Sequence, residues 1–183
     1  MLRADVSGGD AAEEGRRSVT VQAASSALAP AAIGARVVAF IIDAIILAFC
    51  RYALGGIVGD VTIVGGLTRA LIFAALGFLY FGYSWTAWRA SPGQRVLGLG
   101  TVNAVDGATL TWNQATMRWA YLFGPSVLNT VFDAQVGGAL GALVSLIVLG
   151  YYLYLLYTAA TDPSRQGFHD KQAGTLVTMR SAA

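Results

Sequence analysis

The stretch ARVVAFIIDAIILAFCRYALGGIV (Ala35–Val58) is long and apolar enough to cross a lipid bilayer, yet it contains an acidic residue. About 20 apolar residues are needed to span roughly 30 Å of hydrocarbon. Arg36 stands near its beginning and Asp43 lies inside it. A carboxylate within a spanning helix costs roughly 2.5–3.5 kcal/mol by insertion measurements, so it is usually retained because it faces a partner, a cavity or a pathway. The sequence therefore predicts a membrane protein whose functional question centres on Asp43.

The composition indicates lipid contact for much of the chain. Of its 183 residues, 56 % are hydrophobic and 12 % are charged, and the mean hydropathy is +0.59. Soluble proteins carry roughly 25 % charged residues, so a soluble core of this size would not hide so much apolar surface. The single cysteine, Cys50, excludes an intramolecular disulfide, and the single histidine, His169, excludes a multi-histidine metal site. We expect no metal, no cofactor and no enzymatic activity, because no nucleophile–base pair is recognisable.

Four apolar segments predict an all-α bundle of transmembrane helices. The expected spans cover residues 37–58, 70–88, 115–132 and 136–159. The third segment is the weakest of the four, because Arg118, Pro125 and Asn129 interrupt its apolar run. Lipid tolerates a proline in a helix when neighbouring groups satisfy the freed carbonyl. Residues 35–180 are thus expected to form one transmembrane domain, preceded by a disordered cytoplasmic tail over residues 1–34.

The distribution of basic residues orients these spans. With four spans, only Arg51 and Arg69 of the twelve Lys and Arg residues fall on one side of the membrane. The positive-inside rule then places both termini in the cytoplasm. A three-span arrangement that omits residues 115–132 fits less well, because it moves the basic C-terminal segment outside. The basic surface is suited to anionic lipid head groups, and we expect no nucleic-acid partner.

The loop between the second and third spans carries capping and turn signals. In SPGQRVLGL, Ser91 stands at an N-cap position and Pro92 at the first helical position, which predicts a short amphipathic helix at the membrane surface. The segments TVNAV and ATLTW then flank an Asp-Gly pair at residues 106–107, a strong hairpin signal. We expect the strand-like segment Thr175–Arg180 to join this small cytoplasmic β-hairpin as a third strand.

Arg36 and Asp43 are seven residues apart, which brings both side chains nearly to one face of a helix, about 10 Å apart along its axis. One interpretation is that Asp43 binds a cation or a proton in a water-filled cavity, with Asn129 of the third span as a candidate oxygen ligand. The other interpretation is structural: Asp43 accepts hydrogen bonds from a neighbouring span or pairs with an arginine. Both alternatives stay open at this point.

A charged cluster follows the fourth span. The dipeptide Asp-Pro ends that span, because the residue before a proline is disfavoured in a helix, and His169 and Asp170 come shortly afterwards. His169 titrates near neutrality and is therefore a candidate proton relay or pH sensor. Alternatively, Asp170 caps a turn or pairs with Arg95 or Arg118 and so docks the C-terminal segment on the middle loop. The expected charged network comprises Arg36, Asp43, Arg95, Arg118, His169 and Asp170.

Three blocks of the chain together resemble the RDD family of bacterial membrane proteins. They are the spacing Arg36-x-x-Ala39-x-x-x-Asp43, the loop SPGQRVLGLGTVNAVDGATLTWNQATMRW (Ser91–Trp119) and the closing segment DPSRQGFHDKQAGTLV (Asp162–Val177). On this resemblance, the arginine and the two aspartates for which the family is named fall on Arg36, Asp43 and Asp170. The chain departs from the family pattern at two places, where Gln94 replaces a common Lys and Ser91 replaces a Thr.

The resemblance implies a polytopic bundle and two candidate functions. Transport of ions or small solutes is proposed for the family, partly from the intramembrane aspartate, and other members look like accessory parts of membrane complexes. Gly137 and Gly141 form a G-x-x-x-G pattern that allows close helix contact within the bundle or between chains. We therefore expect ion or small-solute handling through Asp43. The alternative is a non-enzymatic accessory subunit that binds other membrane subunits or a second copy of itself.

Overall fold

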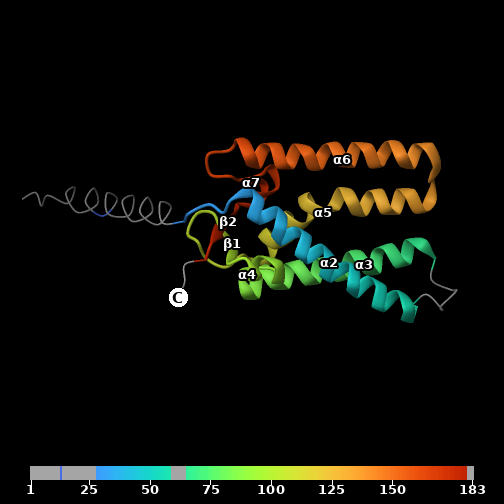
Figure 1. The fold of residues 1–183 in the computed structure, drawn as a ribbon, viewed down its shortest axis with the longest axis horizontal. Helices are drawn as coiled ribbons and strands as arrows, with labels where there is room; N and C mark the ends of the chain where they lie inside the picture. The colour runs from blue at the N-terminus through green and yellow to red at the C-terminus, as the bar shows by residue number, and fades with distance from the viewer. Residues whose placement is uncertain (1–12, 14–27, 59–64, 181–183) are drawn as a thin grey trace, which may run out of the picture.

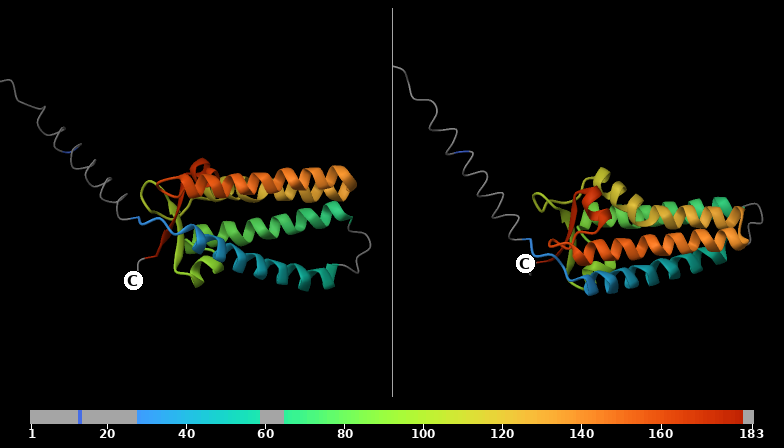
Figure 2. Two further views of the ribbon diagram at one scale, coloured as in Figure 1. Left: turned by 45° about the horizontal axis from the view of Figure 1, so that its top comes forward. Right: turned by 90° about the horizontal axis from the view of Figure 1, so that it is seen from above.

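The computed structural model describes residue 13, residues 28–58 and residues 65–180. Within these residues, four long helices lie side by side, and short helices and strands close one end of the bundle (Figure 1, Figure 2). The order is α2 (Ile33–Val58), α3 (Gly66–Trp88), α4 (Pro92–Val96), β1 (Leu99–Asn103), α5 (Trp112–Gln135), α6 (Gly138–Thr161), α7 (Phe168–Ala173) and β2 (Thr175–Met179). We call the end that carries α4, α7 and both strands the capped end, and the opposite end the distal end.

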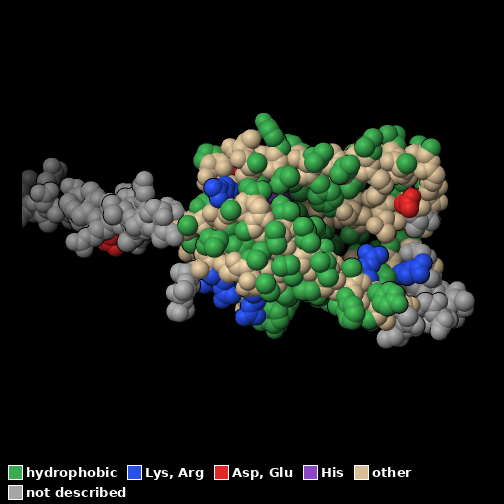
Figure 3. Space-filling model, in the orientation of Figure 1, with side chains coloured by type: hydrophobic (Ala, Val, Ile, Leu, Met, Phe, Trp, Pro, Cys, Tyr) green, Lys and Arg blue, Asp and Glu red, His purple; other side chains and the backbone are tan. Residues whose placement is uncertain are grey.

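Three of the long helices are long and apolar enough to cross a membrane. They contain the stretches Ile33–Gly55 of α2, Leu67–Trp88 of α3 and Gly138–Thr161 of α6. At 1.5 Å per residue, stretches of 22 to 24 residues reach about 33–36 Å. Apolar side chains such as Phe49 and Leu146 point outward from these helices, and apolar atoms dominate the face shown in Figure 3. This outward display is what lipid contact requires, and it confirms the expectation of a membrane-type helical protein.

The fourth long helix, α5, is as long as a membrane span but less apolar than the other three long helices. It covers 24 residues, continues through Pro125 as one helix and runs along the bundle beside α6. Polar residues, among them Arg118 and Asn129, keep it outside the group of strongly apolar helices. The expected helical bundle is therefore confirmed with three candidate spans, and α5 occupies the fourth position as a helix of mixed polarity.

The expected β-hairpin around residues 106–107 is wrong. Among the described residues, β1 pairs antiparallel with β2, in a register that sets Leu99 opposite Met179 and Asn103 opposite Thr175. The C-terminal segment is thus a strand, as expected, but it is the direct partner of β1 and not the third member of a hairpin. A local turn signal could not reveal this pairing, because the two strands are separated by three helices.

The segment after the Asp-Gly turn begins a helix because its cap favours one. The Thr111 hydroxyl accepts a hydrogen bond from the Gln114 N–H, and the Gln114 side chain accepts one from the Thr111 N–H. This reciprocal capping box satisfies two of the donors that a helix start leaves unpaired. It outweighs the strand propensity of the residues just before it.

The N-terminal approach to α2 belongs to the capped end. Most of the tail expected over residues 1–34 lies outside the described residues. Of its last part, Pro30 forms a bridge with Thr178 of β2, and Ala31 is fully buried. The chain therefore adds an edge to the two-stranded sheet before α2 begins.

The capping box of α5 gives a first prediction. Thr111→Ala should lower the free energy of unfolding by about 1 kcal/mol, the usual cost of losing an N-cap. Thr116→Ala is the matched control, because Thr116 is exposed on the same helix and its hydroxyl donates to the Trp112 carbonyl of its own helix. Thermal unfolding in detergent micelles compares the two variants. An equal loss of stability in both would contradict the capping role of Thr111.

Candidate functional site

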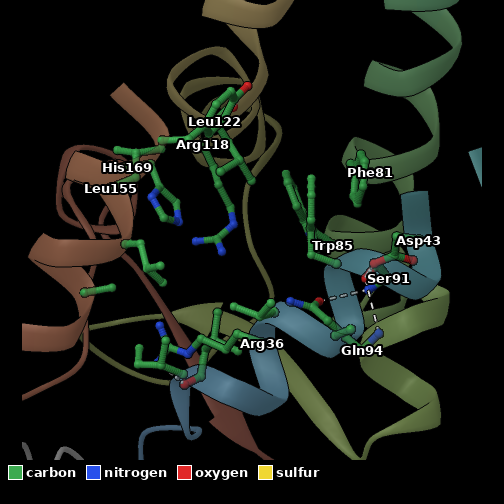
Figure 4. A pocket seen from close by; sticks show the side chains of 18 residues that line it. Arg36, Asp43, Phe81, Trp85, Ser91, Gln94, Arg118, Leu122, Leu155 and His169 are labelled. Carbon is green, nitrogen blue, oxygen red and sulfur yellow. Dashed lines mark hydrogen bonds between the residues drawn. The ribbon is translucent and has the colours of Figure 1, made fainter. Parts of the chain in front are cut away.

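Asp43 lies on α2 near the capped end and is enclosed by protein. It is only 2 % exposed. Its Oδ1 accepts hydrogen bonds from the Tyr80 hydroxyl at 2.8 Å and from the Gly93 N–H at 2.8 Å, and its Oδ2 accepts one from the Ser91 hydroxyl at 2.5 Å. One carboxylate thus joins α2 to α3 and to the start of α4, and Figure 4 shows Asp43 beside Ser91. These three donors compensate the buried negative charge, which would otherwise be costly.

The SPGQ turn is built to reach this carboxylate. Ser91 also caps α4 through a capping box with Gln94. Gly93 has no side chain, and a Cβ there would lie 2.2 Å from the Ala39 carbonyl oxygen and 2.9 Å from Cγ of Asp43. Glycine is therefore what allows α4 to approach α2 so closely. The expected short helix is confirmed as a helix, with Gly93 and Gln94 buried, and its position at the membrane surface stays a prediction.

A second buried carboxylate, Asp170 of α7, organises the rest of the capped end. Arg118 of α5 pairs with its Oδ1, and the Nη1 atom of Arg36 on α2 lies 3.5 Å from its Oδ2. The Nε2 atom of His169 also lies 3.5 Å from Oδ2 of Asp170. The same Oδ2 atom accepts a hydrogen bond from the Gly167 N–H at 3.0 Å. The Asp170 side chain is only 1 % exposed. Its buried charge is compensated by arginines from two helices and by the N–H group of Gly167 in its own turn.

The residues of the expected charged network divide into two groups. The structure brings Arg36, Arg118 and His169 to Asp170, whereas Asp43 binds hydroxyl and amide donors. Arg95 belongs to neither group. It is exposed, and its guanidinium lies 5.3 Å from the centre of the Trp88 ring. Of the two arginines considered as partners of Asp170, Arg118 therefore takes that place.

Asn129 of α5 and Gly141 of α6 lie in contacts between these two helices. The Asn129 amide donates to the Ser145 hydroxyl at 3.1 Å and accepts from it at 3.3 Å. The structure does not bring Asn129 to Asp43. Gly141 of the G-x-x-x-G pattern is buried, and a Cβ there would lie 2.4 Å from an oxygen of Asp133. Its close contact therefore lies within the chain.

A cavity of about 320 Å³ lies among the long helices near the capped end. Most of its lining is apolar, with Phe40, Leu122 and Leu156 as examples. Its polar lining consists of Arg36, Asp43, Trp85, Ser91, Gln94, Arg118, Tyr152 and His169. Figure 4 shows that several of these side chains come from opposite sides of the space, so the cavity connects the two carboxylate-centred groups.

The sequence alone did not indicate that Tyr80 and Trp85 contribute to the site. Both lie on α3 among aromatic residues whose clustering near the end of a span is typical of a membrane interface. Only the fold shows that the Tyr80 hydroxyl reaches Asp43 and that Trp85 is buried beside Arg118. Nothing in their spacing distinguishes them from aromatic residues that face lipid.

Burial and neighbouring charges set the protonation states at Asp170. Burial lowers the pKa of His169 to about 4, and Arg118 and Arg36 add to this effect against the opposing influence of Asp170. Burial alone would raise the pKa of Asp170, but Arg118, His169 and Arg36 together hold the pKa of its carboxyl below the usual range. At neutral pH the imidazole is thus neutral and the carboxylate is charged.

Comparison with known proteins gives one match. The sequence model of the RDD family matches residues 30–174, a range that includes both carboxylates, the SPGQ turn and all four long helices. No curated protein and no solved structure matches the chain.

The close approach of α4 to α2 predicts the effect of a single methyl group. Gly93→Ala should lower the free energy of unfolding by about 1–3 kcal/mol, because the added Cβ overlaps the Ala39 carbonyl oxygen. Gly77→Ala is the matched control, since the space around a Cβ at this position of α3 is open and alanine favours helix over glycine. Thermal unfolding in detergent measures both. Equal stabilities of the two variants would contradict the close contact.

The buried neutral imidazole predicts that stability falls in acid. The pKa of His169 drops from its ordinary value of 6.5 to about 4 on folding, so the unfolded chain takes up the proton first. Stability of about 3 kcal/mol, fully present above pH 6.5, is therefore lost as the pH falls from 6.5 to 4. His169→Gln removes the titrating group and should flatten this part of the stability profile. An unchanged profile would assign the loss to other groups.

Proposed function

The chain belongs to the RDD family, and on that premise we propose that it handles a small solute or ion in the membrane, through the cavity beside Asp43. The observation that carries this proposal is that the one acidic side chain lining the cavity among the described residues is Asp43. Acidic groups in membrane helices that face a cavity usually mark a solute or ion pathway. The mainly apolar lining with a few placed polar groups is typical of a binding site for a small molecule.

The proposed setting is the bacterial inner (plasma) membrane, with the capped end and both termini in the cytoplasm. The charge distribution supports this orientation by the positive-inside rule. At the distal end the basic residues among those described are Arg51 and Arg69, and Figure 3 shows basic side chains at both ends of one face. The capped end carries Arg36, Arg89, Arg95, Arg118, Arg165, Lys171 and Arg180.

Chain connectivity supports α5 as the fourth span. If α3 and α6 both span the bilayer, the chain leaves α3 at the capped end and enters α6 at the distal end (Figure 1). The segment between them must then cross the bilayer, and α5 is the one helix of residues 89–137 with sufficient length. Its polar side chains are tolerable there because Arg118 is buried and Asn129 binds Ser145.

Asp43 links the proposed solute site to the cap. The donors on its carboxylate come from α3 and from the SPGQ turn, and the same side chain lines the cavity. A proton or cation that binds Asp43 competes with these donors and so weakens the attachment of α4 and α3 to α2. Asn129 takes no part in this step, because its partner is Ser145.

The accessory-subunit alternative has less support. Its motif, the G-x-x-x-G of α6, places Gly141 against Asp133 within the chain. Solute handling therefore remains the function that the arrangement of the site favours, and we propose no chemical reaction for the protein.

Gradient-driven flux tests the proposed function. In liposomes with an imposed pH or sodium gradient, the protein should dissipate the gradient, and Asp43→Asn should slow this at least about tenfold, because a neutral amide neither carries the charge nor accepts hydrogen bonds at both of its ends. Asp106→Asn is the matched control, since Asp106 is exposed in a turn outside the bundle.

The same preparations are checked by thermal unfolding, so that a misfolded variant is recognised. If the folded parent protein dissipates neither gradient, or if Asp43→Asn is folded and as active as the parent, the proposal is wrong.

A further inference from the structure

We propose that the cavity binds an amphipathic carboxylate, whose head group lies on the arginines of the capped end and whose apolar body lies among the long helices. This inference rests on the proposed function, because it names the chemical class of the solute for the same cavity.

The charges around Asp170 do not balance among themselves. Asp170 is one carboxylate shared by two guanidinium groups, those of Arg36 and Arg118, and His169 is neutral at neutral pH. This group therefore carries one excess positive charge. Asp43 makes no ion pair among the described residues, because its oxygens accept hydrogen bonds from hydroxyl and amide donors. Buried charge is costly unless it is paired, so this end of the cavity favours an anion.

Buried nitrogen atoms without hydrogen-bond partners among the described residues point to the same place. They are Nε of Arg36, Nε of Arg118, Nε1 of Trp85 and Nδ1 of His169, and all four residues line the cavity. Arg118 is 4 % exposed and Trp85 is 2 % exposed. In Figure 4 the side chains of Arg118 and His169 extend toward the space beside Trp85. Because buried donors are nearly always satisfied in proteins, the N–H groups of Arg36, Arg118 and Trp85 suit an acceptor that enters the cavity. The Nε2 atom of the neutral His169 faces Asp170, so its Nδ1 atom is an acceptor and takes no part in this step.

The hydrogen bonds of Arg118 leave part of its guanidinium for such an acceptor. Among the described residues, only its Nη1 atom makes hydrogen bonds, to Asp170 and Thr175. Its Cζ atom lies 5.1 Å from the centre of the Trp85 ring. Asp170 and Thr175 thus bind the Nη1 atom of the guanidinium, and Trp85 covers one of its faces. The Nε edge stays available for a second carboxylate, which a planar guanidinium binds well.

The rest of the lining decides the shape of the ligand. Phe40, Phe81, Leu122, Leu155 and Leu156 supply apolar surface from all four long helices. An inorganic anion would leave this surface uncovered, and a neutral apolar molecule would leave the arginine nitrogens without an acceptor. A carboxylate on an apolar body satisfies both parts of a cavity of about 320 Å³.

Binding to the full-length protein in phosphatidylcholine nanodiscs tests the inference. Octanoate, octan-1-ol and octylammonium have the same apolar body and differ in the charge of the head group. Titration calorimetry and tryptophan fluorescence should show octanoate binding at least about tenfold more tightly than octan-1-ol, with octylammonium weakest. Oleate, which resides in the bilayer, is then added as a competitor. Displacement of octanoate identifies a membrane-resident acid, and lack of displacement identifies a water-soluble one; both results support the carboxylate.

Two variants separate cavity binding from binding at the surface. Ala159→Leu fills the cavity from α6 without changing a charged group, because Ala159 is buried and lines the cavity, and it should weaken octanoate binding at least about tenfold. Arg95→Gln removes an exposed arginine from the same end and should leave binding unchanged. If Ala159→Leu does not fold, Trp85→Phe replaces it, which removes one unpartnered N–H and should weaken binding severalfold.

Equal affinities for octanoate and octan-1-ol, or full octanoate binding by a folded Ala159→Leu variant, would overturn the inference. Its failure is distinguishable from that of the proposed function. Octanoate binding without gradient-driven flux leaves the ligand class standing and removes solute transport. Flux without octanoate binding removes the ligand class and leaves transport.

Discussion

Compensation of two buried carboxylates is the constraint on which the capped end of this bundle depends. A carboxylate that leaves water must gain hydrogen bonds or opposite charge, and the two acidic residues solve this problem differently. Asp43 gains uncharged donors from α3 and the SPGQ turn, whereas Asp170 gains two arginines from α2 and α5. Each carboxylate therefore attaches a segment outside the long helices to the helices themselves. The cap is held by polar contacts, while the helices present apolar surface outward.

The same two groups define the chemical character of the cavity. One side of the cavity offers a carboxylate whose hydrogen bonds are satisfied, and the other offers guanidinium groups with nitrogens to spare. Apolar side chains fill most of the wall between them. The cavity therefore has a negative side at Asp43 and a positive side at Arg36 and Arg118. It lies among helices whose outer surface is suited to lipid. That combination, more than any single residue, is the basis on which we propose solute handling.

Local signals in the sequence identified what depends on local physics. Hydropathy located the long helices, Ser91 and Pro92 located the start of α4, and the residues of β2 read correctly as a strand. Long-range pairing left no such signal. The Asp-Gly pair suggested a hairpin, but the cap at Thr111 directs the chain into α5 and frees β1 to pair with β2. The role of Gly93 also became visible only once α4 was seen against α2, because the backbone that excludes a side chain there comes from another helix.

The pairing of β1 with β2 has a consequence for the biosynthesis of the protein. Strand β2 and helix α7 follow every long helix in the chain, so they leave the ribosome after those helices. Until then Arg36 and Arg118 lack the carboxylate that they share in the finished protein. Neutralisation of these two arginines by Asp170 therefore requires the last part of the chain to be made.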